Sequence, residues 1–131
     1  MKMTKEQLDF LGSEILDACI TVHREMGPGL LESVYKAALM IELALRDIPC
    51  QEEVRIFVSY KGRQTGKYFD IDLLVCDEII LELKAVKEVV PLFEAKLLNH
   101  LRLTDKRLGY LVNFNVLRLK DGFQRFVNKL Y

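Results

Sequence analysis

Hydrophobic residues recur at helical intervals through the first third of the chain. Between positions 5 and 26 they follow one another every three or four residues and so line one side of a helix: Leu8, Leu11, Ile15, Cys19, Val22 and Met26. Thr4 and Gln7 form a capping box before this series, and Gly27-Pro28-Gly29 ends it. A second series predicts a helix over about 31–46, with its buried side made by Leu31, Val34, Tyr35, Ala38, Leu39 and Leu45.

Beyond residue 50 the apolar residues alternate, which is the period of a strand. Val54, Ile56 and Val58 predict a strand that ends near Tyr60, and Lys61-Gly62-Arg63 has the composition of a turn. The later segments predict strands over 67–75, 79–84 and 108–114, and a helix over about 92–104 that follows Pro91. The last of these strands is almost wholly apolar, as a strand covered on both faces requires.

The final segment, residues 117–127, predicts a short hairpin that turns at Asp121-Gly122 or, alternatively, a short C-terminal helix. The complete order is α-α-β-β-β-α-β plus this terminal hairpin, so we expect an α/β fold with a mixed sheet. With 131 residues and no repeat or linker, the chain is expected to form one domain over residues 1–131.

The composition argues against several classes of protein. No apolar run approaches the roughly 18 residues of a membrane span, and the first residues lack the apolar stretch of a signal peptide. The three cysteines are scattered, with no Cys-x-x-Cys pair and no zinc-like cluster with the two histidines. Such cysteines are typical of reduced thiols in a cytoplasmic protein, and a reactive cysteine is the less favoured alternative.

The net charge is zero, but the charges are unevenly spread. Residues 1–83 hold 9 Lys/Arg and 15 Asp/Glu, whereas residues 84–131 hold 10 Lys/Arg and 4 Asp/Glu. This asymmetry is compatible with a basic groove for a polyanion beside an acidic metal site. Two solvated surfaces of different charge explain it equally simply, and charge alone slightly favours that interpretation.

The stretch KYFDIDLLVCDEIILELKAV, residues 67–86, carries the clearest chemistry. If its two strands are antiparallel and joined by residues 76–78, one face pairs Val75 with Ile79, Leu73 with Leu81, and Ile71 with Leu83. The other face then pairs Leu74 with Ile80, Asp72 with Glu82, and Asp70 with Lys84. A slip of one residue would mix apolar and charged positions, so the hydrophobic pattern selects this register.

The opposed carboxylates suggest a metal site. Directly opposed residues have Cβ atoms roughly 4.5–5.5 Å apart, where Asp72 and Glu82 would repel each other unless a cation or a proton intervenes. Mg²⁺ is commonly held by one or two carboxylates together with waters and phosphate oxygens. Lys84, on the same face, could orient a water or neutralise a phosphate, which completes a hydrolytic set. The alternative is a solvated face on which Glu82 pairs with Lys84 or an arginine, and Asp70 with Lys84.

These residues resemble a known family. Asp72 followed by Glu82-Leu83-Lys84 is similar to the D…ExK signature of the PD-(D/E)XK nuclease superfamily. Gly29 to Tyr35 resembles the GxxExxY motif of a small bacterial and archaeal protein family in that superfamily. The segments GPGLLESVY, DIDLLV, ILELKAV and LVNFNV all resemble blocks of that family, so the likeness covers nearly the whole chain. It implies the superfamily's restriction-endonuclease-like core and agrees with the element order.

The resemblance also implies roles for individual residues. Asp72, Glu82 and the backbone carbonyl of Leu83 would bind Mg²⁺ or Mn²⁺, and Lys84 would position the attacking water. Glu32 matches an acidic residue that many members direct at the metal, although a glutamate in a first helical turn is also stabilised by the helix dipole. Tyr35, one turn further, would either fix the Glu32 carboxylate or pack as a core aromatic.

The chain departs from the family pattern at two positions. Related members often carry Gln-x-x-x-Tyr on the helix after ExK, and here those positions are Lys96 and His100. Their spacing puts both on one helix face, from which they could contact substrate. A lysine there could contact phosphate or compete with the metal for the carboxylates.

Three functions follow from these residues. The first is a Mg²⁺- or Mn²⁺-dependent nuclease acting on DNA, less favourably on RNA, with catalytic residues Lys84, Glu82, Asp72 and Glu32. The second is an inactive nucleic-acid-binding module, favoured by the substitutions at Lys96 and His100. The third is an assembly domain that forms a homodimer through the apolar edge of the terminal hairpin. Since no recognition element is added to the core, sequence specificity is expected only with a partner protein.

Overall fold

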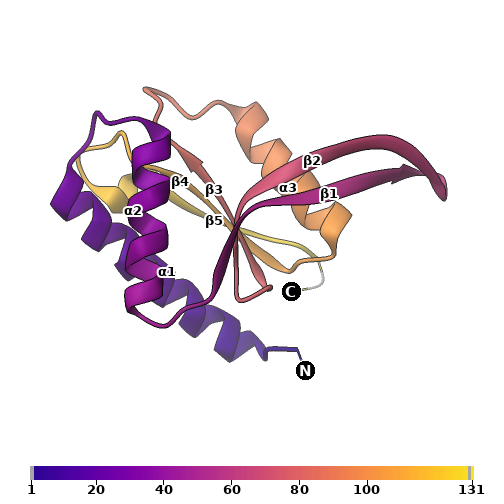
Figure 1. Ribbon diagram of the computed structural model, residues 1–131, viewed down its shortest axis with the longest axis horizontal. Helices are drawn as coiled ribbons and strands as arrows, with labels where there is room; N and C mark the ends of the chain where they lie inside the picture. The colour runs from indigo at the N-terminus through magenta and orange to yellow at the C-terminus, as the bar shows by residue number, and fades with distance from the viewer. Residues whose placement is uncertain (1, 130) are drawn as a thin grey trace.

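The computed structural model describes residues 2–129 and 131 (Figure 1). Three helices accompany one five-stranded sheet in the described part of the chain, so the predicted mixed α/β fold is confirmed. In chain order the elements are α1 (Lys5–Met26), α2 (Glu32–Leu45), β1 (Cys50–Tyr60), β2 (Arg63–Val75), β3 (Ile79–Lys84), α3 (Pro91–Thr104), β4 (Leu108–Asn113), a 3-10 turn η1 (Leu119–Gly122) and β5 (Phe123–Val127).

The two N-terminal helices begin and end close to where the sequence predicts. The capping box before α1 is confirmed, because the Gln7 backbone N–H donates to Thr4 Oγ1 at 3.1 Å and the Thr4 N–H donates to Gln7 Oε1 at 2.8 Å. Two positions of the predicted buried side are wrong, since Leu31 is 73% exposed and Leu45 is 74% exposed. Leu31 precedes the first turn of α2, and Leu43 instead of Leu45 faces the core.

The sheet has the strand order β1-β2-β3-β4-β5. Only β3 and β4 pair in parallel, and α3 is the crossover between them. Figure 1 shows α1 and α2 together on one side of the sheet and α3 apart from them. Two apolar clusters follow from this layering. The larger joins α1 and α2 to one face of the sheet, and the smaller joins Leu97 and Leu101 of α3 to the other. β3 and β4 are therefore covered on both faces, as their apolar sequences predict.

The β1–β2 ribbon is longer than the sequence predicts. β1 begins at Cys50 and β2 at Arg63, each four residues before the predicted start. Lys61 (φ 50°) and Gly62 (φ 76°) form the two-residue turn between them, and two successive positive φ values are typical of a type I′ hairpin turn. In Figure 1 the ribbon curves away from α1 and α2 and reaches past the rest of the sheet. We call residues 54–71, the outer part of this ribbon, the arm.

The prediction of a terminal hairpin is wrong in part. Phe123–Val127 is a strand, as predicted, but it pairs antiparallel with β4, and residues 119–122 form a 3-10 turn. The preceding segment is held on α1, because Leu119 is buried in the larger core cluster and His23 Nε2 lies 2.7 Å from the Val116 carbonyl oxygen. Because of those contacts, residues 116–119 pack on α1 and do not pair with Phe123–Val127 as a second strand.

None of the helices within the described residues combines the length and the apolar character that crossing a membrane requires.

Candidate active site

Glu82 lies in the middle of the sheet with a fixed neighbour. Its side chain is buried on β3, and Oε1 lies 2.9 Å from Nδ1 of His100 on α3. The His100 ring in turn stacks on Phe69 of β2, with centroids 4.0 Å apart. A buried carboxylate needs such a partner, so α3 fixes where the Glu82 carboxylate points.

Asp72 occupies the neighbouring strand at the point where β2 leaves β3. Its Oδ2 accepts a hydrogen bond of 2.9 Å from the backbone N–H of Leu83. Burial and the negative charge of Glu82 raise the pKa of Asp72 to about 6, against a smaller lowering by the Leu83 N–H. The two candidate carboxylates therefore interact electrostatically, as the sequence suggested.

The predicted register holds for three pairs and then fails. Val75 with Ile79, Leu74 with Ile80, and Leu73 with Leu81 are confirmed as partners. The predicted pairing of Ile71 with Leu83 is wrong, because Ile71 packs in the α3-side cluster whereas Leu73 and Leu83 belong to the opposite one. The Asp72 carboxylate takes the Leu83 N–H, so a side chain stands where the ladder would continue. Asp72 and Glu82 are thus neighbours without being ladder partners.

Asp70 and Lys84, which the register paired, point to other partners. Asp70 Oδ1 lies 3.3 Å from Nε of Arg55 across the β1–β2 ribbon. Lys84 ends β3, is partly buried, and has its Nζ 4.1 Å from the centre of the Phe93 ring on α3. The described structure holds no salt bridge from Lys84 to Asp70 or Glu82. Its ammonium is therefore not consumed by an ion pair with a candidate ligand.

Asn113 stabilises the backbone beyond Lys84. Its side chain is buried and bonds the Val86 backbone twice, accepting from N–H at 3.0 Å and donating to the carbonyl at 2.9 Å. Asn113 is also the β4 partner of Lys84 in the parallel ladder. This amide holds the chain that follows the catalytic candidates, and the sequence block LVNFNV was the only signal for it.

Helix α2 contributes charge to the same region. Glu32, its first residue, is exposed, and its negative charge contributes to the raised pKa of Asp72. Lys36, one turn later, forms ion pairs with Glu53 and Glu52 of β1, and its positive charge counteracts the rise in the Asp72 pKa. The sequence analysis does not single out Lys36, and its i, i+4 spacing from Glu32 is the signal that identifies it.

Tyr35 and Lys96 stand apart from the carboxylates. Tyr35 is fully buried and stacks on Phe114, with centroids 4.6 Å apart, and its hydroxyl bonds the Gly27 carbonyl and the Leu30 N–H. It is a core aromatic that holds the GPGL loop, and it neither reaches the surface nor bonds Glu32. Lys96 is exposed on α3, one turn before His100. Of the two departures from the family pattern, His100 alone contacts a candidate ligand.

The donor set fits a hard divalent cation bound in part by water. Asp72 and Glu82 could supply carboxylate oxygens, and the Leu83 carbonyl, directly after Glu82 in the chain, could supply a third oxygen. Within residues 2–129 and 131, no group of three or more His, Cys, Asp or Glu side chains is arranged to hold a metal ion. Glu32 therefore does not complete a three-carboxylate cluster. Burial first, and then the charge of Glu82, raise the pKa of Asp72, and a bound cation would favour the charged carboxylate against both effects.

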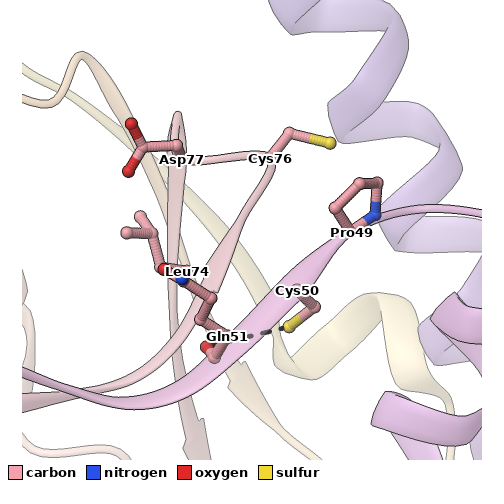
Figure 2. Close-up of a pocket in the computed structure, with 6 residues that line it drawn as sticks. All are labelled: Pro49, Cys50, Gln51, Leu74, Cys76 and Asp77. Carbon is pink, nitrogen blue, oxygen red and sulfur yellow. Dashed lines mark hydrogen bonds between the residues drawn. The ribbon is translucent and has the colours of Figure 1, made fainter.

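The thiols are separate from this centre. Figure 2 shows a depression lined by Pro49, Cys50, Gln51, Leu74, Cys76 and Asp77, which includes neither Asp72 nor Glu82. Burial raises the pKa of Cys50 to about 11 and also raises the pKa of Cys76 and Cys19. Thiols with raised pKa values are poor nucleophiles at neutral pH, so the structure supports three free, unactivated cysteines.

A protein-family model of the PD-(D/E)XK nuclease superfamily matches residues 9–126. The chain belongs to this superfamily. Comparison with curated proteins and comparison with solved structures each gave no significant match.

Proposed function

We propose that this protein is a Mg²⁺- or Mn²⁺-dependent nuclease that hydrolyses phosphodiester bonds in DNA, with RNA as the second candidate substrate. The observation that carries the proposal is that Asp72 and Glu82 are neighbouring carboxylates held by the Leu83 N–H and by His100. Burial and the charge of Glu82 raise the pKa of Asp72 to about 6, which supports a functional site. Membership of a nuclease superfamily supports the same chemistry.

The residues divide the work as follows. Asp72, Glu82 and the Leu83 carbonyl would hold the metal, with Glu32 acting on it through water. When bound, the metal would supply an activated water and stabilise charge on the phosphoryl oxygens. Lys84, whose ammonium is free of carboxylate partners in the described structure, would donate a hydrogen bond to the attacking water or to the phosphate. His100 orients Glu82, and the Leu83 N–H orients Asp72.

One observation favours the inactive binding module instead. His100 Nδ1 already occupies one Glu82 oxygen, so a histidine stands where a metal could bind. Glu82 nevertheless has a second oxygen, which is the reason for ranking the nuclease first. The assembly domain ranks third, because the terminal hairpin on which it rested does not form and β5 alone lies at that edge of the sheet.

Two finer assignments accompany this proposal. The motif from Gly29 to Tyr35 supports placing the chain in the GxxExxY family within the superfamily. The three free cysteines support a cytoplasmic location.

Calorimetric titration of Mn²⁺ and Mg²⁺ tests the proposal directly. Wild type should bind at neutral pH, and Glu82→Gln, which keeps an oxygen for His100, should lose the binding while remaining folded by circular dichroism. Glu88→Gln, an exposed carboxylate outside the site, is the matched control and should bind as wild type does. The same three proteins are then assayed on single-stranded, duplex and branched DNA and on RNA. Absence of both metal binding and cleavage in folded wild type would reject the nuclease and leave the binding module.

A further inference from the structure

One face of the arm carries aromatic rings that are largely exposed to solvent. Phe57 of β1 is 63% exposed and its ladder partner Tyr68 of β2 is 49% exposed. Their ring centroids are 5.8 Å apart in an edge-to-face arrangement. The Arg55 guanidinium lies over the Tyr68 ring, 3.8 Å from its centre. The three side chains form one continuous surface, which we call the aromatic face.

The opposite face of the arm explains why these rings point outward. Val54, Ile56 and Phe69 pack against the apolar cluster beneath α3. Because side chains alternate along a strand, Arg55, Phe57 and Tyr68 must then point away from that cluster. The aromatic face is thus held in place by packing on its reverse side and does not depend on a loop.

The arm is rich in positive charge. Residues 54–71 contain four cations, Arg55, Lys61, Arg63 and Lys67, against the single carboxylate Asp70. At the tip, Tyr60 is 65% exposed and Lys61 Nζ lies 5.5 Å from the centre of its ring. Residues 1–83 as a whole have an excess of acidic residues, so the arm is a local reversal of that balance.

We propose that the arm binds unpaired nucleotides of a single-stranded nucleic acid, with bases stacked on Tyr68 and Phe57 and phosphates contacted by Arg55 on the same face and by Lys61 and Arg63 at the tip. Exposed rings on a positively charged surface are the combination that single-strand binding uses, because every base offers a stacking face and every nucleotide a phosphate. In a duplex the base faces are covered by their neighbours, so the rings would contribute nothing there. This inference rests on the proposed function in one respect only: the bound strand would be the polymer that the carboxylate site cuts.

The aromatic face leads to the carboxylates along one strand. Tyr68 and Asp72 are four residues apart on β2, roughly 13 Å at the rise of an extended strand. Asp70 lies between them and pairs with Arg55. A strand of nucleic acid held on the arm would therefore reach the root of the arm, where Asp72 and Glu82 stand.

Charge argues against a second copy of the chain as the occupant. Two arms placed side by side would bring four cations against four, and like charges at short range are repulsive. A polyanion would instead neutralise the cations of the arm.

Tryptophan fluorescence tests the stacking directly, because the chain has no tryptophan. Tyr68→Trp places a single indole on the aromatic face, and Phe10→Trp places one at an exposed position on α1, away from the arm. Both proteins are titrated in EDTA, which prevents cleavage, with an oligothymidylate, an oligouridylate and a blunt DNA duplex. We expect both single strands to quench Tyr68→Trp, and neither to quench Phe10→Trp.

Four results would overturn the proposal. They are no quenching of Tyr68→Trp by either single strand, equal quenching of Phe10→Trp, equal quenching by the duplex, and an emission that changes with protein concentration alone, which would indicate self-association. A difference between oligothymidylate and oligouridylate would identify DNA or RNA as the preferred strand.

Affinity supplies the second measurement. We expect Tyr68→Ala to weaken oligothymidylate binding in EDTA by about 5- to 150-fold, the range for one lost base stack, and Tyr68→Phe to bind as wild type does. Phe10→Ala is the matched control. Unchanged affinity in Tyr68→Ala would contradict single-strand binding by the arm, even if the protein cuts DNA. If binding depends on Tyr68 but the protein cuts no substrate, single-strand binding by the arm is supported and the nuclease activity is rejected.

Discussion

The centre of the sheet and the arm are built from the same strand and differ in what covers them. In β3 every residue but Lys84 is buried, and β4 is buried throughout, with helices on both faces. The arm has one face packed against the α3-side cluster and the other open to solvent. β2 runs through both regions, from Arg63 at the tip to Val75 inside the sheet.

The difference shows where a polar centre can be placed in a small fold. Deep in the sheet a carboxylate must be paired, as Glu82 is with His100, and far out on the arm Asp70 is simply a partner of Arg55. Asp72 lies at the transition, buried enough for its pKa to rise to about 6 and still close to solvent. A metal and a phosphate could both reach such a position. The experiments below change one region and leave the other intact.

The largest effect is expected from the core. Leu81 is fully buried in the larger cluster, so Leu81→Ala should lower the free energy of unfolding by about 2–5 kcal/mol through lost burial and a residual cavity. Phe57→Ala, on the open face of the arm, should change it by about 0.5 kcal/mol or less. Urea denaturation followed by circular dichroism measures both. Similar losses in the two variants would mean that the arm is covered in solution.

The next effect concerns catalysis at the end of β3. We expect Lys84→Ala to lower the cleavage rate by about 100-fold or more, the scale of one lost proton-transfer or charge-stabilising group. Mn²⁺ affinity should be unchanged, since Lys84 is not a ligand. Lys87→Ala, an exposed lysine three residues on, is the control and should cut normally. A Lys84→Ala protein that retains full activity would remove Lys84 from the mechanism.

The third effect concerns metal affinity and is expected from the loss of His100. Because it fixes the Glu82 carboxylate, we expect His100→Ala to weaken Mn²⁺ binding by about 10- to 100-fold, as loss of a partner that orients a ligand does. Calorimetry measures the change, with Asn99→Ala on the exposed side of α3 as the control. Tighter binding in His100→Ala would show instead that the histidine competes with the metal for Glu82.

The charge on Asp72 should make the stability of the protein depend on pH. Its folded pKa of about 6 lies above the ordinary value of 3.8, so the folded state binds this proton more tightly than the unfolded state does. Stability from this group is therefore fully present below about pH 4 and is lost as the pH rises through 6. Asp72→Asn removes the repulsion and keeps an acceptor for Leu83 N–H. At pH 7 it should stabilise the metal-free protein by about 1 kcal/mol, after discounting for partial solvent screening.

Thermal unfolding of wild type and Asp72→Asn between pH 4 and 8, with and without Mn²⁺, checks this prediction. Mn²⁺ should stabilise wild type and leave Asp72→Asn unchanged. If the metal-free variant is less stable than wild type at pH 7, Asp72 is stabilised by its surroundings and the electrostatic argument for the metal fails.

The smallest effect is expected at Lys96. It is exposed on α3, and if it contacts a phosphate, Lys96→Gln should reduce the salt dependence of oligonucleotide binding by about one unit of slope. Fluorescence anisotropy at several salt concentrations measures the slope. Lys120→Gln in η1 is the control. An unchanged slope would remove Lys96 from the substrate surface.

Periodicity predicted the helices and the inner strands because burial on one face determines which residues can be apolar. It also located Asp72 and Glu82, since charged residues in a run such as DIDLLV or ILELKAV are conspicuous. Two ends of the predicted strands escape prediction, because residues 51–53 and 64–66 are polar or glycine. Gln51 and Glu52 are strand residues through pairing with Leu74 and Leu73, and Gln64 through pairing with Ser59.

The change of face at Asp72 could not be predicted from the pattern of residues. Ile71 and Leu73 continue the alternation without interruption, yet they pack in opposite clusters. The ribbon changes face where Glu53 takes a left-handed backbone (φ 49°) and where Asp72 bonds Leu83. Both features depend on neighbours distant in the sequence. The role of His100 as the partner of Glu82 likewise required the crossing of α3 over β3.

The turn at Lys61 and Gly62 has a consequence for how such a protein can change. It joins two strands at an exposed tip, far along the chain from the residues that hold the carboxylates. Exposed tips of this kind tolerate inserted residues better than any other part of a fold. The arm can therefore be lengthened, shortened or replaced with Asp72, Glu82 and Lys84 left in position, so that reach and substrate preference can diverge among related proteins while the chemistry is inherited intact.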